Sequence, residues 1–189
     1  MKYDILLCGV GGQGVLSIAA VIAQAAVKEG FFVKQSEVHG MAQRGGAVQA
    51  HLRLASTPIY SDLIPKGAAS MILSMEPLET LRYIPYLAVD GQVISAKDPV
   101  RNIPNYPDLE NVLKTIQQFP HYRILATMEI ARKVGFPRAS NLVLVGAASL
   151  HLPLSPDSLQ NAIRELFSQK GEEVVQGNLA AFEQGRQKV

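Results

Sequence analysis

The sequence contains few of the residues that hold metals and redox clusters. Cys8 is the only cysteine in 189 residues, which excludes an internal disulfide and a cluster ligated by several cysteines of this chain. The histidines lack the spacing of metal ligands; they are His39, His51, His121 and His151. We therefore expect this chain to bind no metal and no iron–sulfur cluster by itself.

The sequence also has no excess of one charge and no long apolar run. Its 18 basic and 16 acidic side chains give a formal net charge of +2, without the clustered basic run typical of nucleic-acid binding. No uncharged apolar stretch approaches the roughly 18 residues of a membrane span, and the first residues lack the pattern of a signal peptide. We expect a cytoplasmic protein that binds neither nucleic acid nor membrane.

Length and hydrophobic content suit one α/β domain over residues 1–189. Apolar segments alternate with helical patterns at first, and helical patterns dominate from Leu109 on. This order predicts a three-layer α/β/α domain with a mostly parallel, Rossmann-like sheet, some antiparallel strands and a helical C-terminal part. Strands are predicted at Tyr3–Cys8, Phe31–Ser36, Ala47–Leu54, Ile59–Ser61, Ala68–Met75 and Val93–Ala96. Helices are predicted at Gly14–Gly30, Glu76–Leu87, 109–118, 127–134, 140–151, 156–168 and 171–185.

Two of these segments carry more specific information. Ala47–Leu54 alternates between apolar and polar residues, which predicts a half-exposed and antiparallel strand with His51 and Arg53 on its polar face. The helix at Gly14–Gly30 is apolar nearly all round, so it must be buried on more than one side. Either the C-terminal helices cover it, or another subunit does.

Residues 9–14 read GVGGQG and lie between a predicted strand and a predicted helix. In the pattern G-x-G-x-x-G the backbone can approach a ligand closely, and the helix N-terminus attracts an anion. Phosphate is the usual anion, so nucleotides and coenzyme A are both candidates. The alternative is that the glycines only fit the helix closely to the sheet. The candidate cofactor-binding residues are Gly9, Gly11, Gly12, Gln13 and Gly14.

Residues 36–46 read SEVHGMAQRGG and follow the next predicted strand, so both glycine-rich segments should lie at the same end of the sheet. Arg44, with Gly45 and Gly46, could form bidentate contacts to a carboxylate or phosphate. Glu37 and His39 are two residues apart and could act together as an acid–base pair. The alternative is a structural Glu–Arg pair that shapes the loop, with His39 as an interface hydrogen-bonding residue.

A dinucleotide site would also require an acidic residue at the end of the second strand, to bind the ribose hydroxyls. Glu37 lies near that place, but Ser36-Glu37-Val38-His39-Gly40 is not the usual ending of such a strand. This weakens the alternative that the chain is a stand-alone Rossmann-type NAD(P)-binding module.

Three strings resemble the gamma subunit or domain family of 2-oxoacid (pyruvate, ketoisovalerate or indolepyruvate):ferredoxin oxidoreductases, in particular the indolepyruvate type, where this part is the beta subunit. The strings are YDILLCGVGGQGVLSIAAVIAQAA, QSEVHGMAQRGGAVQAHLRL and NLVLVGAASL. SEVHGMAQRGG is the specific part. The resemblance covers most of the chain and is weak in the proline-rich middle.

The resemblance implies an enzyme that oxidises a 2-oxoacid with coenzyme A, releases carbon dioxide and reduces ferredoxin. Thiamine diphosphate, Mg²⁺ and the iron–sulfur clusters would belong to a larger partner subunit, because this chain has one cysteine and no GDG metal motif. The chain itself would complete the active-site cleft and contribute to coenzyme A binding. In isolation we expect a catalytically silent chain that self-associates, for example as a homodimer, or binds the larger subunit. A third possibility is a structural subunit without a ligand of its own.

Overall fold

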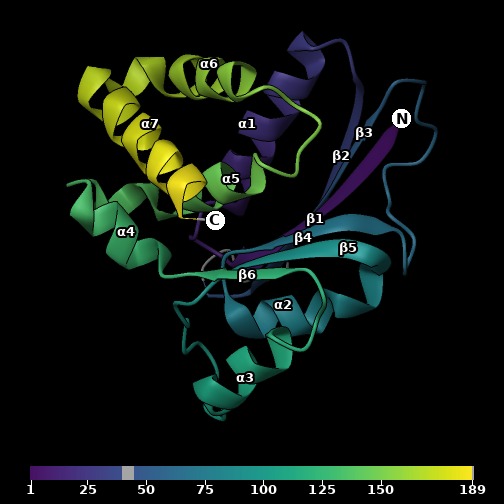
Figure 1. The fold of residues 1–189 in the computed structure, drawn as a ribbon, viewed down its shortest axis with the longest axis vertical. Coiled ribbons are helices and arrows are strands. Elements are labelled where there is room, and N and C mark those ends of the chain that lie inside the picture. The colour runs from purple at the N-terminus through teal and green to yellow at the C-terminus, as the bar shows by residue number, and fades with distance from the viewer. Residues whose placement is uncertain (40–44, 189) are drawn as a thin grey trace.

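The structure is a computed structural model that describes residues 1–39 and 45–188. A six-stranded sheet runs through the molecule in the order β2-β3-β1-β4-β5-β6 (Figure 1). Strand β3 is antiparallel to both of its neighbours, whereas β1, β4, β5 and β6 are parallel to one another. The mostly parallel sheet with an antiparallel segment is therefore confirmed. The strands are β1 (Lys2–Val10), β2 (Phe32–His39), β3 (Ala47–Ala55), β4 (Ala69–Ser74), β5 (Leu87–Ala96) and β6 (Tyr122–Leu125).

Helices cover both faces of the sheet and give the three layers expected from the sequence (Figure 1). One face carries α1 (Val15–Lys28), α4 (Thr127–Lys133), α5 (Ser140–Ala148), α6 (Pro156–Phe167) and α7 (Glu172–Gln187). The other face carries α2 (Pro77–Tyr83) and α3 (Leu109–Ile116). Helix α2 gives way to a short 3-10 turn at Ile84–Tyr86, because Pro85 cannot continue an α-helix.

The largest core lies between the sheet and the layer that contains α1, α5 and α7. Its members come from both ends of the chain and are fully buried; they include Ile5, Ile18, Leu52, Val143 and Phe182. Two smaller clusters under the opposite face bury Leu6 and Ile72, and Val93 and Ile116. The sheet is therefore buried on both faces along β1, β4 and β5, as a parallel sheet requires.

The apolar first helix is covered within the chain. Helix α1 packs on the sheet, on α5 and on α6, and Lys28 at its end pairs with Glu165 of α6. Helix α5 is buried along its length from Asn141 to Ala148, largely against α7. The C-terminal helices therefore cover α1, and the expected self-association no longer follows from its apolar surface.

The second face of β3 is buried rather than half-exposed, so that prediction was wrong. His51 is 3% and Arg53 7% exposed, because the loop of residues 56–67 folds over them. The Arg53 guanidinium donates two hydrogen bonds to the Asp4 carboxylate, at 2.9 and 3.2 Å. It also donates to the carbonyls of Ser61 and Leu63, at 2.8 and 2.9 Å.

The same contacts explain why residues 59–61 form a loop instead of the predicted short strand. Carbonyl groups of this segment accept hydrogen bonds from a buried side chain and not from a neighbouring strand. His51 adds a further anchor, since its Nδ1 accepts the N–H of Ile64 at 3.0 Å, and burial lowers the pKa of its imidazole.

Two further differences concern strand ends. Strand β2 continues to His39, so Glu37 and His39 lie on a strand and not in a loop. Strand β6 interrupts the part that was predicted to be helical, and only Leu125 of its four residues is buried. A segment so short and polar shows no recognisable period. No helix within the described ranges is long and apolar enough to cross a membrane.

Candidate functional site

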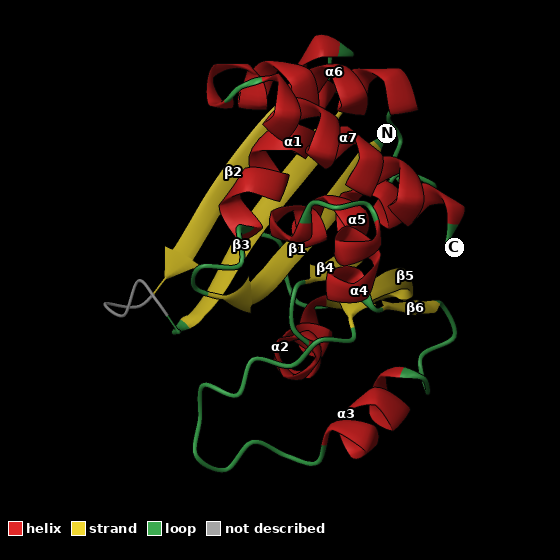
Figure 2. Cartoon of the chain, turned by 90° about the vertical axis from the view of Figure 1, so that its left-hand side faces the viewer, coloured by secondary structure: helices red, strands yellow, loops and turns green. Residues whose placement is uncertain are grey.

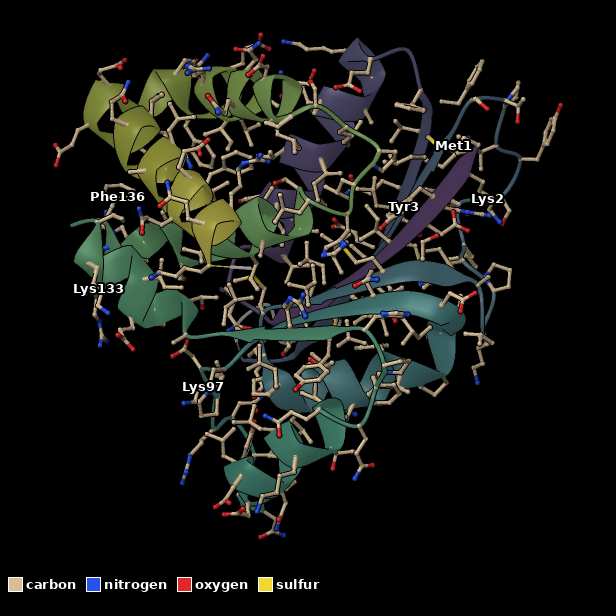
Figure 3. The ribbon with its side chains drawn as sticks, in the orientation of Figure 1. Met1, Lys2, Tyr3, Lys97, Lys133 and Phe136 are labelled. Carbon is tan, nitrogen blue, oxygen red and sulfur yellow. The ribbon has the colours of Figure 1, made fainter. Side chains whose placement is uncertain are left out.

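The candidate site lies at the edge of the sheet where β1, β4, β5 and β6 end, called here the carboxyl edge. Figure 2 looks onto this edge. Figure 3 shows Lys97 and Phe136 toward this side of the molecule, and Met1, Lys2 and Tyr3 at the opposite end, where β1 begins. Ligands of α/β sheets bind outside the carboxyl ends of parallel strands, so this edge is where a site is expected.

The two glycine-rich segments meet here, as predicted. The N–H of Gly11 donates to the carbonyl of Gly46 at 2.8 Å, and the N–H of Gly45 donates to the carbonyl of Gly11 at 3.2 Å. The Asn102 side chain donates to the carbonyl of Gly45 at 2.6 Å. Three segments far apart in the sequence are thereby joined around the end of β1.

Gln13 and Gly9 shape the first loop from within. The Gln13 amide accepts the N–H of Val10 at 2.7 Å and donates to the carbonyl of Met75 at 2.9 Å, so it ties the end of β1 to the end of β4. A Cβ on Gly9 would lie only 2.8 Å from the Cβ of Met75. The packing role considered for this loop applies to both residues, and their contact with a ligand remains a prediction.

Gly12 presents open backbone, whereas Gly14 lies against the side chain of Asn141. Gly14 precedes α1 with a φ of 83°, and α1 has neither a side-chain cap nor an acidic residue in its first turn. Gly12 has a φ of 100°, and a Cβ built on it would meet no atom within 4 Å. The N-terminal N–H groups of a helix have no partner within the helix, and the helix dipole makes this end positive. The first turn of α1 is therefore suited to an anion.

A cavity of about 450 Å³ adjoins these residues and is called here the glycine-loop cavity. Among the described residues its lining is backbone and small or apolar side chains without a carboxylate: Val10, Gly11, Gly12, Gly14, Val15, Leu16, Ser17 and Val48. Such a cavity can hold a phosphate group near α1 and an apolar portion of the same ligand.

A second cavity of about 530 Å³ lies on the other side of Gly12 and is called here the proline-loop cavity. It is lined by Gly12, Gln13, Met75, Asp98, Pro99, Val100, Thr127, Met128, Pro137, Arg138 and Ser140. Asp98 is the one carboxylate among the described lining residues, and it accepts hydrogen bonds from Thr127 Oγ1 and the Met128 N–H at 3.0 and 3.1 Å. Asp98 therefore acts as a cap for α4.

The proline-rich loop is held in place by Glu76, which is 1% exposed. Its carboxylate accepts the Val100 N–H at 3.3 Å, the Tyr106 hydroxyl and, at the start of α2, the Glu79 N–H at 2.9 Å. Burial and the neighbouring carboxylate raise the pKa of Tyr106. This loop, residues 97–107, is thus fixed against α2 and forms a wall of the proline-loop cavity.

Glu37 does not reach the glycine loop through the sheet. It pairs with Ala50 of β3, which in turn pairs with Leu7 of β1, so two strand spacings of about 10 Å in all separate Glu37 from β1. A dinucleotide site needs the second strand beside the first, which places its acidic residue at the ribose. The insertion of β3 argues against an NAD(P) site of this type.

The proposed pairing of Glu37 with His39 or Arg44 remains a prediction. His39 is the last residue of β2, and Arg44 lies outside the described residues.

Metal-ligand side chains do not cluster in the described part of the chain. It contains no group of three or more His, Cys, Asp and Glu side chains that could hold an ion. Cys8 is buried, and burial raises the pKa of its thiol to about 12, far from the thiolate that a cluster requires.

The domain is a Rossmann-like α/β domain, because a glycine loop joins a buried strand to an apolar helix at the carboxyl edge of a mostly parallel sheet. It differs from a dinucleotide-binding domain in that β3 lies between β2 and β1. The chain belongs to the pyruvate ferredoxin/flavodoxin oxidoreductase family, which matches residues 4–188. This confirms the resemblance seen in the sequence.

Named relatives agree with this family. The chain is 35% identical to indolepyruvate oxidoreductase subunit IorB of Methanothermobacter thermautotrophicus, over 98% of this chain and 96% of that one. It is 26% identical to 2-oxoglutarate synthase subunit KorC of Methanothermobacter marburgensis, over 99% and 96%. The chain is therefore related to subunits of 2-oxoacid oxidoreductases.

Solved structures share the fold. The gamma subunit of a keto/oxoacid ferredoxin oxidoreductase from Geobacter sulfurreducens matches with a TM-score of 0.70 at 24% identity, over 98% of this chain and 97% of that one. The 2-oxoglutarate:ferredoxin oxidoreductase from Magnetococcus marinus, with 2-oxoglutarate, coenzyme A and succinyl-CoA bound, matches with a TM-score of 0.77 at 21% identity. This chain spans 30% of that larger protein, and 98% of its own length is matched.

Proposed function

We propose that this chain is the subunit of a 2-oxoacid:ferredoxin oxidoreductase that holds no redox cofactor, and that its carboxyl edge forms one wall of the active-site cleft and binds coenzyme A. The observation that carries the proposal is the uncapped start of α1 beside Gly12, which opens on the glycine-loop cavity. The coenzyme A bound in the Magnetococcus marinus relative supports the choice of ligand.

We assign the substrate as indolepyruvate or another aryl pyruvate. Four relatives named as indolepyruvate oxidoreductase subunits are 34–36% identical to this chain, whereas the 2-oxoglutarate synthase subunits are 26–28% identical. The reaction would convert the 2-oxoacid and coenzyme A into the acyl-CoA and carbon dioxide, and the two electrons released would pass to ferredoxin.

The cofactors of this reaction are assigned to a larger partner subunit. Thiamine diphosphate with Mg²⁺ supplies the decarboxylation chemistry, and iron–sulfur clusters carry the electrons to ferredoxin. The one cysteine of this chain is buried, and the described residues contain no cluster of metal-ligand side chains. Both observations argue against Mg²⁺ or an iron–sulfur cluster on this chain. Its own residues would bind and orient the coenzyme: the α1 N-terminus attracts a phosphate group, and the apolar wall at Leu16 and Val48 excludes water.

The test is the replacement of Gly12 by alanine in the enzyme assembled with its larger subunit. The new methyl group has room within the chain but protrudes where the ligand must approach the backbone. We expect the Michaelis constant for coenzyme A to rise about tenfold or more, since one methyl group at a close contact costs that much binding. Steady-state turnover at varied coenzyme A and saturating 2-oxoacid measures it.

Gly67→Ala is the matched control. Gly67 also has a positive φ, of 74°, with no atom within 4 Å of a built Cβ, but it lies in the loop over β3, outside both cavities. Both variants carry a similar backbone strain of about 1–2 kcal/mol, so both should melt at similarly lowered temperatures. An unchanged Michaelis constant in Gly12→Ala, or an equal change in the control, would refute the coenzyme A role.

A further inference from the structure

The end of β1 shows how the glycine loop is attached to the sheet. The parallel pairing of β1 with β4 runs to Cys8 and Ser74, and the Met75 N–H then donates to the Cys8 carbonyl at 2.8 Å. The next bond of such a ladder would join the Val10 N–H to the Met75 carbonyl. In its place, the Gln13 side chain accepts the Val10 N–H at 2.7 Å and donates to the Met75 carbonyl at 2.9 Å. A carboxamide is therefore inserted between the ends of the two strands.

The two backbone groups that Gln13 joins belong to buried residues and need opposite partners. Val10 is 2% and Met75 3% exposed. The N–H of Val10 requires an acceptor and the carbonyl of Met75 requires a donor, because unpaired backbone groups in the interior cost free energy. A side-chain amide supplies both from one group, whereas an ionised carboxylate can only accept. The backbone around Gln13 therefore explains why this position carries an amide.

The same residue closes the turn that contains Gly12. The Gln13 N–H donates to the Val10 carbonyl at 3.1 Å, so backbone and side chain of Gln13 together bind both backbone groups of Val10. Residues 10–13 form a four-residue turn, and its third residue, Gly12, has the positive φ, here 100°, that type II turns have at that position. A Cβ on Gly9 would lie 2.9 Å from Gln13 Oε1, so Gly9 makes room for this side chain. One side chain thus fixes the backbone of Gly12, which lines both the glycine-loop and the proline-loop cavity.

We propose that Gln13 is a positioning residue of the coenzyme A site, whose carboxamide holds the Gly11-Gly12 turn in the conformation that leaves its backbone open to the ligand. This inference rests on the proposed function, and it assigns to Gln13 an action through Gly12 instead of a contact with the ligand. The oxygen and one N–H of the side chain are already engaged within the chain. Without them the turn would sample other conformations, and binding would include the free-energy cost of ordering it again.

The experiment compares two substitutions in the enzyme assembled with its larger subunit. Gln13→Met keeps the length of the side chain and removes both hydrogen bonds. We expect it to raise the Michaelis constant for coenzyme A about tenfold at every pH, with turnover at saturation unaltered. Steady-state turnover at varied coenzyme A and saturating 2-oxoacid measures both quantities.

Gln13→Glu adds a pH profile to the test. An ionised carboxylate accepts the Val10 N–H but faces the Met75 carbonyl without a donor, whereas a protonated carboxyl group supplies both partners. Burial raises the pKa of such a group above its usual value of about 4.3. The Michaelis constant, relative to the wild type at the same pH, should therefore fall toward one as the pH is lowered from about 8 to about 5. A ratio of one at both ends of this range would refute the inference, even if Gln13→Met did not assemble.

Two further measurements separate position from charge and fold. Gln118→Met and Gln118→Glu are the matched controls, because Gln118 is exposed and lines neither the glycine-loop nor the proline-loop cavity. Both should leave the Michaelis constant unchanged. Amide hydrogen exchange gives a readout apart from activity: the Val10 N–H should exchange at least about tenfold faster in Gln13→Met than in the wild type.

The outcomes separate this inference from the proposed function. If Gln13→Met speeds exchange at Val10 but leaves the Michaelis constant unchanged, Gln13 only stabilises the fold and the inference is refuted. If Gln13→Met matches the wild type and Gln13→Glu is impaired at high pH alone, repulsion between charges explains the effect and the inference is again refuted. If Gly12→Ala weakens coenzyme A and neither Gln13 variant does, the proposed function stands without this inference. If none of the three variants has an effect, the proposed function fails as well.

Discussion

Replacing Arg53 by methionine is expected to lower the free energy of unfolding by about 3–5 kcal/mol, because it leaves a buried carboxylate without its main partner. Asp4 is 1% exposed and receives two hydrogen bonds from the guanidinium. Lys2 lies 3.0 Å from the same carboxylate but is half exposed, so it replaces only part of that interaction. The loop of residues 56–67 would lose two further hydrogen bonds at Ser61 and Leu63.

Urea unfolding followed by circular dichroism at neutral pH measures this loss. Arg132→Met, which removes an exposed arginine on α4, is the control and should change the free energy of unfolding by at most about 0.5 kcal/mol. Adding Asp4→Asn to Arg53→Met should restore part of the stability, since the uncompensated charge is then removed. A loss below about 1 kcal/mol in Arg53→Met would contradict this account of the buried pair.

The second large effect is expected where α5 crosses α7. A Cβ on Gly146 would lie 2.0 Å from the carbonyl oxygen of Phe182, and one on Gly185 would lie 2.0 Å from that of Val143. The two helices therefore touch backbone to backbone. Gly146→Ala should lower the free energy of unfolding by about 3 kcal/mol or more, because the helices must move apart.

The test depends on whether Gly146→Ala lowers or raises the free energy of unfolding. At an exposed helix position, glycine to alanine stabilises by about 1 kcal/mol, so a gain at Gly146 would show that the backbones do not touch. Ala180→Gly, at an exposed position of α7, serves as the control and should lose about 1 kcal/mol from helix propensity alone. Thermal and urea unfolding of the three proteins would give the comparison.

Local sequence patterns were sufficient to predict the positions of the glycine loop, the first helix and the antiparallel strand. The alternation in 47–54 predicted β3 correctly, because a period of two depends only on neighbouring residues. The same pattern gave the wrong burial for His51 and Arg53, because their cover comes from a loop that folds back through long-range contacts. A polar residue on a strand does not reveal in the sequence which distant segment will satisfy it.

The strand order could not be predicted from local sequence patterns either, although it decides most strongly which ligand the site can bind. The sequence placed Glu37 after a second strand, as a dinucleotide site would, and only the insertion of β3 moves it away from β1. Arg138, which lines the proline-loop cavity, was not singled out for a related reason. It lies in a region without a motif, and only the topology brings it to the same cavity as Gly12 and Gln13. The nearest signal was the apolar string NLVLVGAASL, which begins at Asn141.

The most direct test of the central claim compares the purified chain with the complex formed on co-expression with a larger thiamine diphosphate and iron–sulfur subunit. Two signals are measured. The first is the reduction, dependent on indolepyruvate and coenzyme A, of a dye that accepts electrons in place of ferredoxin. The second is the absorbance of iron–sulfur clusters. We expect neither signal from the chain alone and both from the complex, because the described residues contain no cluster of metal-ligand side chains and Cys8 is buried. Oxidation of a 2-oxoacid by the unaided chain would contradict the account, as would a fully active larger subunit that gains nothing from this one.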